Sequence, residues 1–247
     1  MAQKVPQVAI LTIGDEVLRG DTTDANKAFL GAELSSRGMA ARLAVTIPDE
    51  TETIITWVRQ LAADYDYVFV CGGIGPTPDD LTRPAVAQAF SRKLVLREDE
   101  IKRFEQGLGV TFNPGQREMW RLPEGAELVF GDGVYCPGFR LENVYVFAGV
   151  PKIMQAMWQT VAERFSGEPR HEARFMTTTG ESRWAHLMAR YVAEYPELKF
   201  GSYPRMGKHW FAEVVVSGSE SEVVHRVAGK LAKEIEGIVP KQGTSRD

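Results

Sequence analysis

Short apolar segments alternate with helical patterns through the first half of the sequence. Residues 8–13 are almost entirely apolar, and similar β-rich segments occupy 42–47 and 67–70. Between them, apolar residues recur at helical spacing after Asp24 and after Thr51. Nearly continuous apolar strands are typical of parallel sheets, and helices of this length connect such strands. The pattern therefore predicts a three-layer α/β/α fold around a doubly wound, mostly parallel sheet.

The pattern changes in the second half of the chain. Residues 151–165 predict a helix, and the polar segment 166–170 contains a glycine and a proline, as exposed linkers often do. The segments beyond it predict the order β-α-β-β-α. We therefore expect a first domain over residues 1–166 and a smaller α+β domain over residues 167–247.

Composition narrows the class of protein. The chain has 247 residues, of which 44% are hydrophobic, and its formal net charge of −4 argues against nucleic acid as a partner. No apolar run approaches the roughly 20 residues that span a bilayer, so we expect no membrane partner. The first apolar run ends in two acids, which is not a signal-peptide pattern, and the two cysteines do not suggest a disulfide scaffold. A cytoplasmic protein is expected.

The stretch CGGIGPTPDDLT, residues 71–82, follows one of the predicted strands. Gly72, Gly73 and Gly75 remove side chains where the backbone turns or approaches a ligand. The N–H groups of such a loop, together with the N-terminus of the next helix, favour an anion. In doubly wound sheets, ligands bind at this edge, outside the carboxyl ends of the strands. The stretch therefore predicts a phosphate-binding loop.

Two carboxylates in this loop indicate a cation as well. Asp79 and Asp80 would repel a phosphate unless a metal ion lay between them, and Mg²⁺ commonly bridges carboxylates and substrate phosphates. A second acidic pair, Asp15 and Glu16, follows Gly14 at the end of the first strand. The alternative is that the glycines only make a turn and that one of the two aspartates caps the next helix.

Several strings together resemble a known family. They are GDEVLRGDTTDAN, Pro48-Asp49-Glu50, GGIGPTPDDLT and the PGF of residues 137–139. The segment from Val8 to Phe165 resembles the MoaB/Mog-like molybdopterin-binding fold and, more closely, the amino-terminal domain of the CinA family. The rest of the chain resembles the small domain that follows in CinA-type proteins. No deamidase domain of the kind that ends full-length CinA is present, so the chain resembles a short, stand-alone form.

The resemblance implies two kinds of activity. CinA-type domains resemble metal-dependent nucleotide pyrophosphatases, hydrolases that act on ADP-containing dinucleotides such as ADP-ribose or FAD. Molybdenum-cofactor proteins of the same fold bind molybdopterin or transfer an adenylyl group to it. We favour the pyrophosphatase because the similarity to CinA is longer. A molybdopterin-binding protein or adenylyltransferase, and a non-catalytic binding module, remain as alternatives.

The resemblance also assigns residues. Asp49 and Asp80 are the expected catalytic residues, and with Asp79 they are expected to hold a divalent metal ion such as Mg²⁺. The expected partners are a nucleotide or pterin and, as in relatives, a second copy of the chain in a homodimer or other homo-oligomer. The residues expected to bind the substrate are Gly14, Asp15, Glu16, Asn26, Gly72, Gly73, Gly75, Thr77, Pro137 and Gly138.

Some residues depart from the family pattern or carry a plainer interpretation. Ile153 stands where the family usually has a glutamate, which puts any catalysis that needs this acid in doubt. Arg83 is interpreted as a solvated side chain, with a phosphate contact as the alternative. Cys71 and Cys136 are interpreted as small packing residues because no histidine lies near them in the sequence.

Overall fold

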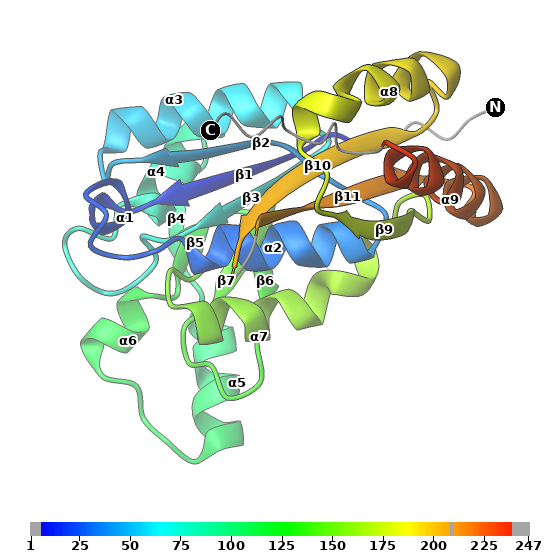
Figure 1. The fold of residues 1–247 in the computed structure, drawn as a ribbon. Helices are drawn as coiled ribbons and strands as arrows, with labels where there is room; N and C mark the ends of the chain where they lie inside the picture. The colour runs from blue at the N-terminus through cyan, green and yellow to red at the C-terminus, as the bar shows by residue number, and fades with distance from the viewer. Residues whose placement is uncertain (1–5, 208–209, 239–247) are drawn as a thin grey trace. The chain divides into compact units, whose positions relative to one another are not determined.

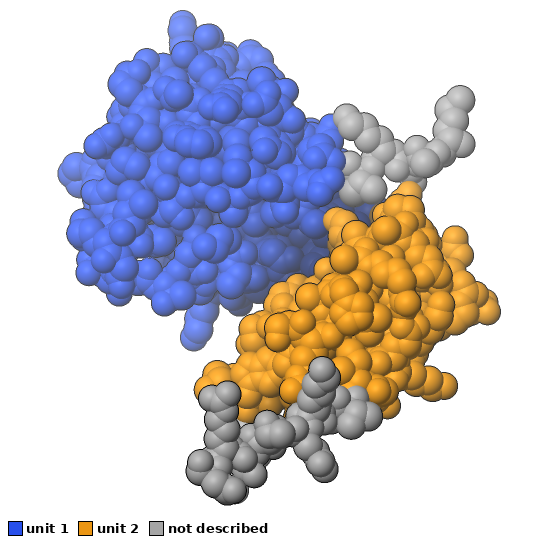
Figure 2. All heavy atoms as spheres, turned by 45° about the horizontal axis from the view of Figure 1, so that its top comes forward, with its two compact units in different colours: residues 1–167 blue, residues 168–247 orange. Residues whose placement is uncertain are grey.

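The computed structural model describes residues 6–207 and 210–238. The chain divides into two compact units, residues 1–167 and residues 168–247 (Figure 2). The N–H group of Gly167 donates a hydrogen bond of 2.8 Å to the carbonyl of Arg37, which ties the end of the first unit to its own helices. The chain is exposed over residues 168–170, where the second unit begins.

The first unit contains a six-stranded sheet (Figure 1). In spatial order its strands are β2 (Ala41–Ile47), β1 (Val8–Ile13), β3 (Tyr67–Cys71), β8 (Val144–Phe147), β7 (Gly138–Leu141) and β6 (Glu127–Val129). Strands β2, β1, β3 and β8 are parallel, while β7 and β6 continue the sheet in antiparallel pairing. The expected mostly parallel sheet is confirmed.

Helices cover both faces of this sheet. In Figure 1, α3 (Thr51–Asp64) lies on one side, and α2 (Ala25–Ser36) and α7 (Pro151–Val161) lie on the other. A short helix, α1 (Asp15–Leu18), follows β1, and α4 (Thr82–Ala89) follows the glycine loop. The predicted start of α2 is confirmed, because the Asp24 carboxylate accepts a hydrogen bond of 2.8 Å from the Lys27 N–H.

Central strands are buried because both faces are covered. All six residues of β1 are buried, and Phe69 of β3 lies at the centre of an aromatic cluster. The ring of Phe69 makes edge-to-face contacts with Trp158 and Phe165 at centroid distances of 5.4 and 5.0 Å. The Trp158 indole N–H donates to Glu33, so the one polar group of this buried ring has a partner. The sheet and α7 are thereby fixed to each other.

Residues 94–123 form an excursion between α4 and β6. Its elements are β4 (Leu94–Leu96), α5 (Glu98–Leu108), α6 (Pro114–Glu118) and β5 (Arg121–Pro123), and β4 pairs antiparallel with β5. A separate small core of Ile101, Phe112 and Trp120 holds the excursion together. Strands of three residues are too short to show a period, so β4 and β5 could not be predicted from the sequence.

The second unit contains a three-stranded antiparallel sheet in the order β10-β11-β9. Its elements are β9 (His171–Thr177), α8 (Glu181–Glu194), β10 (Lys199–Met206), β11 (Trp210–Gly218) and α9 (Ser221–Glu236). Val214 and Val216 of β11 are fully buried and share one core with residues of both helices. The expected small α+β domain is confirmed. Among the described residues, no helix combines the length and apolar character needed to cross a membrane.

Gly72 and Gly20 both have positive φ, but only Gly72 lies against a neighbouring strand. Substituting each by alanine therefore tests how closely the end of β3 packs against β1. Gly72, directly after β3, has φ of 110°, and a Cβ on it would lie 2.2 Å from the carbonyl oxygen of Ile13. Gly20 has φ of 78°, but nothing lies within 4 Å of its Cβ position. We expect Gly20→Ala to lower the free energy of unfolding by about 1–2 kcal/mol, the cost of left-handed backbone alone. Gly72→Ala should cost more than about 3 kcal/mol because a strand must also move.

Urea denaturation of both variants measures these differences. Equal costs for the two substitutions would contradict the steric argument, since both glycines have positive φ but only a Cβ on Gly72 would meet Ile13.

Candidate functional site

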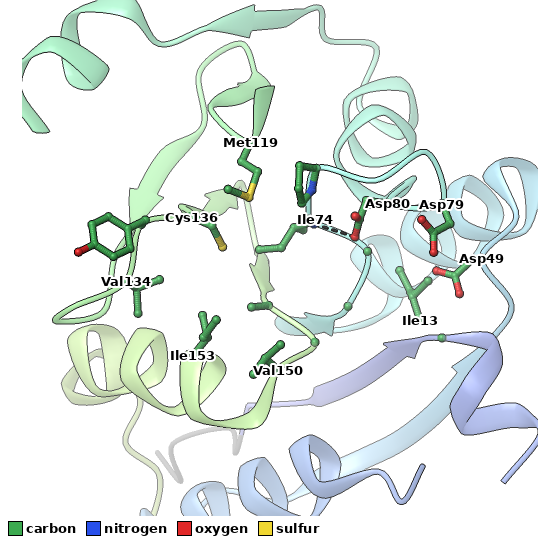
Figure 3. A pocket seen from close by; sticks show the side chains of 18 of the residues that line it. Ile13, Asp49, Ile74, Asp79, Asp80, Met119, Val134, Cys136, Val150 and Ile153 are labelled. Atoms are coloured by element: carbon green, nitrogen blue, oxygen red, sulfur yellow. Dashed lines mark hydrogen bonds between the residues drawn. The ribbon is translucent and has the colours of Figure 1, made fainter. Parts of the chain in front are cut away.

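A cavity of about 620 Å³ opens at the carboxyl ends of the parallel strands (Figure 3). Gly14 follows β1, Asp49 follows β2 after one intervening residue, and Gly72 follows β3. The parallel topology brings these strand ends together, as it does in other open α/β sheets. The predicted site residues that line the cavity are Gly14, Glu16, Asp49, Gly72, Gly73, Gly75, Asp79 and Asp80.

Thr82 sets the direction of the first two peptides of the glycine loop. Its hydroxyl donates to the Gly72 carbonyl at 2.8 Å, and its N–H donates to the Gly73 carbonyl at 3.0 Å. A Cβ on Gly73, which has φ of 66°, would lie 2.3 Å from the Thr82 hydroxyl oxygen. The loop can approach this fully buried threonine only because Gly73 lacks a side chain.

This arrangement leaves two backbone donors available. The C=O and N–H of a trans peptide point in opposite directions. Because the Gly72 and Gly73 carbonyls point towards Thr82, the N–H groups of the same two peptides point away from it. Those N–H groups belong to Gly73 and Ile74, and within the described part of the chain they donate no hydrogen bond. Both residues line the cavity. Unpaired backbone donors of this kind bind anions.

The N-terminus of α7 adds a second source of positive potential. Gly149 and Val150 line the cavity, and Val150 is the N-cap residue of this 11-residue helix. The first N–H groups of a helix have no partner within the helix, and they carry a partial positive charge. The cavity is therefore favourable to an anion from two directions.

Asp80 closes the glycine loop. Its carboxylate accepts hydrogen bonds from the N–H of Gly75 at 2.7 Å, from the N–H of Thr77 at 2.8 Å and from the Thr77 hydroxyl at 2.5 Å. The N-cap residue of α4 is Leu81, and no side chain caps this helix end. Asp80 thus stabilises the loop itself and does not cap the helix. Both donors of Thr77 are occupied, and Thr77 lies outside the cavity lining.

Gly75 makes room for Asp80. It is not in the left-handed region, and a Cβ on it would lie 2.5 Å from one Asp80 carboxylate oxygen. Its N–H is already bonded to Asp80, so it does not offer a free donor to a phosphate. Gly75 therefore lies at the cavity, but its observed contribution is to the stability of the loop, through its hydrogen bond with Asp80 and the room it leaves for that carboxylate.

Arg83 supports the loop from the protein side. It is only 5% exposed, and its guanidinium donates to the carbonyls of Ile74 and Gly75. Burial lowers the pKa of Arg83, and the nearby charge of Asp80 opposes this shift. The interpretation of Arg83 as a solvated side chain is wrong: an isolated arginine in a sequence gives no sign that loop carbonyls will surround it.

Carboxylates gather at the other side of the cavity. Asp49 accepts a hydrogen bond of 2.9 Å from the Asp15 N–H. Burial raises the pKa of Asp49, and the carboxylates of Asp15, Glu16 and Asp79 raise it further. Asp79 is exposed, and the neighbouring Thr77 side chain, followed by its own backbone N–H, lowers its pKa. The negative charge is thus concentrated where a cation would relieve it.

These carboxylates fit a divalent metal ion only in part. Among the described residues, no group of three or more His, Cys, Asp or Glu side chains is arranged to hold a metal. Both oxygens of Asp80 are also engaged by its own loop. Asp49 and Asp79 would suit Mg²⁺ that takes its remaining ligands from water and substrate phosphates, which is its usual coordination in nucleotide sites.

The other predicted site residues lie around the cavity and do not line it. Asn26 is 6% exposed and donates a hydrogen bond of 2.6 Å to the Gly149 carbonyl, which ties α2 to the loop before α7. Pro137 and Gly138 are buried, and a Cβ on Gly138 would lie 2.6 Å from the carbonyl of Val146. Asp15 contributes its N–H to Asp49.

Apolar side chains that sequence reasoning missed complete the lining. Apart from Ile153 and Cys136, which are noted above for other reasons, they lie at the end of β1, at helix ends and in loops, so neither periodicity nor chemistry marks them. Burial raises the pKa of Cys136 to about 11, which makes it a neutral packing residue, as expected, although it also lines the cavity. The apolar residues that line the cavity are Ile13, Ile74, Pro76, Met119, Val134, Tyr135, Cys136, Ala148, Val150 and Ile153.

Comparison with known proteins identifies the family. Residues 9–167 match the family described as a probable molybdopterin binding domain, MoCF_biosynth. The chain belongs to this family. Residues 169–242 match the model described as the middle domain of FAD synthase.

Several known proteins are similar to this chain at moderate sequence identity. A protein from Archaeoglobus fulgidus is 33% identical over 230 residues, which cover 93% of this chain and 96% of that protein. A CinA-like protein from Desulfosudis oleivorans is 33% identical over 94% of this chain, but the match covers only 59% of that longer protein. The structure of CinA from Thermoplasma acidophilum is similar with a TM-score of 0.59 at 26% identity, over 66% of this chain and 99% of that one. The resemblance to CinA is confirmed.

The fit between Gly75 and Asp80 gives a prediction about coupling. Gly75→Ala should displace the Asp80 carboxylate, and Asp80→Ala should leave the loop donors unpaired, each costing about 1–3 kcal/mol of stability. Once Asp80 is removed, the added methyl has room. The double variant should therefore lose at least about 1 kcal/mol less than the sum of the single losses, as measured by urea unfolding. Additive losses would show that Gly75 has a purpose independent of Asp80.

The raised pKa of Asp49 gives a prediction about pH. Folding favours the protonated form of this carboxyl, so its contribution to stability is fully present below its unfolded pKa, near 3.8, and is lost as pH rises through the higher folded pKa. In metal-free protein, Asp49→Asn should therefore raise the melting temperature at pH 7 by about 1–3 °C. The gain should shrink as the pH falls towards 4.

Asp21→Asn provides the control for charge alone. Asp21 is exposed and pairs with Arg19 at 2.9 Å, so removing its charge should give no stabilisation at pH 7. A melting temperature of Asp49→Asn that stays at or below the wild-type value at pH 7 would contradict the assignment of an electrostatic cost to Asp49.

Proposed function

We propose that the protein is a metal-dependent nucleotide pyrophosphatase that acts on an ADP-containing dinucleotide such as ADP-ribose or FAD. One observation carries the proposal. The same cavity holds unpaired backbone donors at Gly73 and Ile74 and open carboxylates at Asp49 and Asp79. Donors suit the phosphate oxygens, and the carboxylates suit the cation that accompanies them.

The residues of the chain divide this chemistry between them. The N–H groups of Gly73 and Ile74 and the start of α7 bind the phosphoanhydride, and Thr82 keeps the loop donors turned towards it. Asp49 and Asp79 would hold the divalent metal ion, which would supply charge neutralisation and activation of water. Asp80 was expected to be catalytic; we now propose that it acts through the loop as a positioning residue.

Molybdopterin chemistry is the second candidate. It is supported by the description of the family over residues 9–167 as a probable molybdopterin binding domain. The match of residues 169–242 to the middle domain of FAD synthase favours dinucleotide chemistry instead. A binding module without catalysis is supported by the use of both Asp80 oxygens inside the loop and by the apolar Ile153 in the cavity wall.

Incubation of the pure protein with candidate substrates separates these functions. The arms are ADP-ribose, FAD, and molybdopterin with ATP, each with Mg²⁺ and with a chelator, followed by chromatography of the products. We expect AMP with ribose 5-phosphate from ADP-ribose, or AMP with FMN from FAD, only when Mg²⁺ is present. Asp49→Asn should lower this rate at least about 100-fold, the scale for losing a group that stabilises transition-state charge.

The control Asp21→Asn removes a nearby acidic charge outside the cavity lining and should keep the wild-type rate. Adenylylated molybdopterin as the only product would favour the second candidate. Binding of a nucleotide without any product in any arm would contradict both enzymes and favour the binding module.

A further inference from the structure

Few polar side chains are buried in the first unit. Aromatic and cysteine residues aside, those among its described residues are Thr12, Asn26, Thr82 and Arg83. Thr82 and Arg83 hold carbonyls of the glycine loop. Burying a polar group is unfavourable unless it gains a partner, so the other two side chains also need a reason.

A chain of hydrogen bonds anchors Asn26. The Thr12 hydroxyl, on β1, donates to the Asp24 carboxylate at 2.7 Å, and this carboxylate also caps α2 by accepting from the Lys27 N–H. Asn26 lies in the first turn of α2, so its backbone is fixed against β1. Its amide donates to the Gly149 carbonyl at 2.6 Å. The end of β1 is thereby connected, through the start of α2, to the loop that leads into α7.

The hydrogen bond from Asn26 sets the direction of one peptide. The peptide between Gly149 and Val150 is trans, so its C=O and N–H point in opposite directions. Because the Gly149 carbonyl points towards Asn26, the Val150 N–H points away from α2. Val150 lines the cavity at the start of α7 (Figure 3), and within the described part of the chain its N–H donates no hydrogen bond. Asn26, which lies outside the lining, thus acts on the cavity through this peptide.

Two loops bring such donors together. A Cβ on Gly149 would lie 3.4 Å from the Cα of Gly72, so the two loops touch backbone to backbone. The unpaired N–H of Gly73 belongs to the peptide that begins at Gly72, and that of Val150 belongs to the peptide that begins at Gly149. Among the described residues, no Lys, Arg or His lines the cavity. Backbone N–H groups from both loops are therefore its source of positive potential.

The other polar atom of the Asn26 amide lowers stability. Its Oδ1 is buried and has no hydrogen-bond partner among the described residues, and the side chain is only 6% exposed. An unpaired buried oxygen is unfavourable, and turning the amide over would place this oxygen against the Gly149 carbonyl. The amide therefore keeps an unpaired oxygen in order to donate to Gly149. Local violations of this kind are typical of functional sites.

We propose that Asn26 is a positioning residue, whose buried amide directs the Val150 N–H towards the anion that the Gly73 and Ile74 N–H groups bind. The proposal rests on the proposed function only in taking that anion to be a phosphate group. Asn26 was expected to bind the substrate; in this proposal it does not touch the substrate, and its effect passes through the Gly149 carbonyl.

Calorimetric titration with methylene diphosphonate and Mg²⁺ tests the proposal. This probe carries two phosphate-like groups, has no ring and is not hydrolysed, so it reports the anion site alone. Asn26→Leu removes the amide at similar size. Val150→Pro removes the N–H itself, and Val150 already has the φ of −67° that proline adopts. Each should weaken binding at least about tenfold, the scale of one hydrogen bond to a charged group. The double variant should lose no more than about twofold beyond Val150→Pro, because both changes act on one donor.

Two matched variants serve as controls. Asn143 precedes β8, lies outside the cavity lining and donates to the carbonyls of Ala62 and Tyr65. Asn143→Leu should lower the melting temperature and leave the affinity for the probe within about twofold of wild type. Val150→Ala keeps the N–H and should also stay within about twofold. Melting temperatures without the probe show that each variant is folded.

Asn26→Asp gives a readout that a merely structural role would not change. An ionised carboxylate cannot donate to the Gly149 carbonyl, whereas a protonated carboxyl can, and burial favours the protonated form. As the pH falls from about 7.5 to about 5.5, the affinity of this variant relative to wild type should therefore rise above that of Asn26→Leu. Asn26→Leu has no proton to gain, and its ratio to wild type should stay constant.

Several results would overturn the proposal. Asn26→Leu would keep wild-type affinity, its loss would add to that of Val150→Pro, Asn143→Leu would weaken the probe equally, or Asn26→Asp would show no recovery. Wild-type protein that binds no probe would refute the anion site as well. Failure of the proposed function is a different result, because no dinucleotide would then be cleaved while the probe would still bind with the same pattern among the variants.

Discussion

The glycine loop depends on one peptide unit that is held from both sides. The buried guanidinium of Arg83 binds the carbonyl of Ile74, and the Asp80 carboxylate binds the N–H of Gly75 in the same peptide. That peptide plane is therefore fixed. In the preceding part of the loop, the carbonyls of Gly72 and Gly73 accept hydrogen bonds from Thr82, so the N–H groups of the same peptides point away from Thr82. The direction of the loop N–H groups thus follows from the contacts that Arg83, Asp80 and Thr82 make with the loop.

Parallel strands make this arrangement possible. The loops that follow β1, β2, β3 and β8 leave the sheet at the same edge, so residues separated by about a hundred positions in the sequence meet without any long-range motif. Close packing of these loops requires glycine: Gly72 approaches the carbonyl of Ile13, and a Cβ on Gly149 would lie 3.4 Å from the Cα of Gly72. These glycines therefore allow the loops to pack closely against each other, in addition to any approach of the backbone to a ligand.

The sequence revealed those parts of the site whose residue types are restrictive. Consecutive glycines after a strand, such as Gly72 and Gly73, allow backbone conformations that other residues rarely adopt. An acidic residue after a strand, such as Asp49, is rarely part of a hydrophobic core. Their positions at the sheet edge could therefore be predicted. The purpose of Asp80 could not, because a carboxylate that bonds its own loop and one that meets a metal look the same in a sequence. The apolar wall was equally hidden, since nothing in the sequence distinguishes a residue such as Val134 until the fold places it beside a cavity.

The carboxylates beside the glycine loop lower the stability of the first unit at neutral pH. Ionised Asp49 is partly buried and surrounded by the negative charges of Asp15, Glu16 and Asp79, an arrangement that raises its pKa and opposes folding at neutral pH. The interior of the sheet needs none of these carboxylates, since β1 and β3 are apolar apart from Thr12 and Tyr67. A cation brought in with phosphates would turn the same repulsion into attraction. The carboxylates around Asp49 therefore cost stability in the protein alone and become favourable only when such a cation is bound.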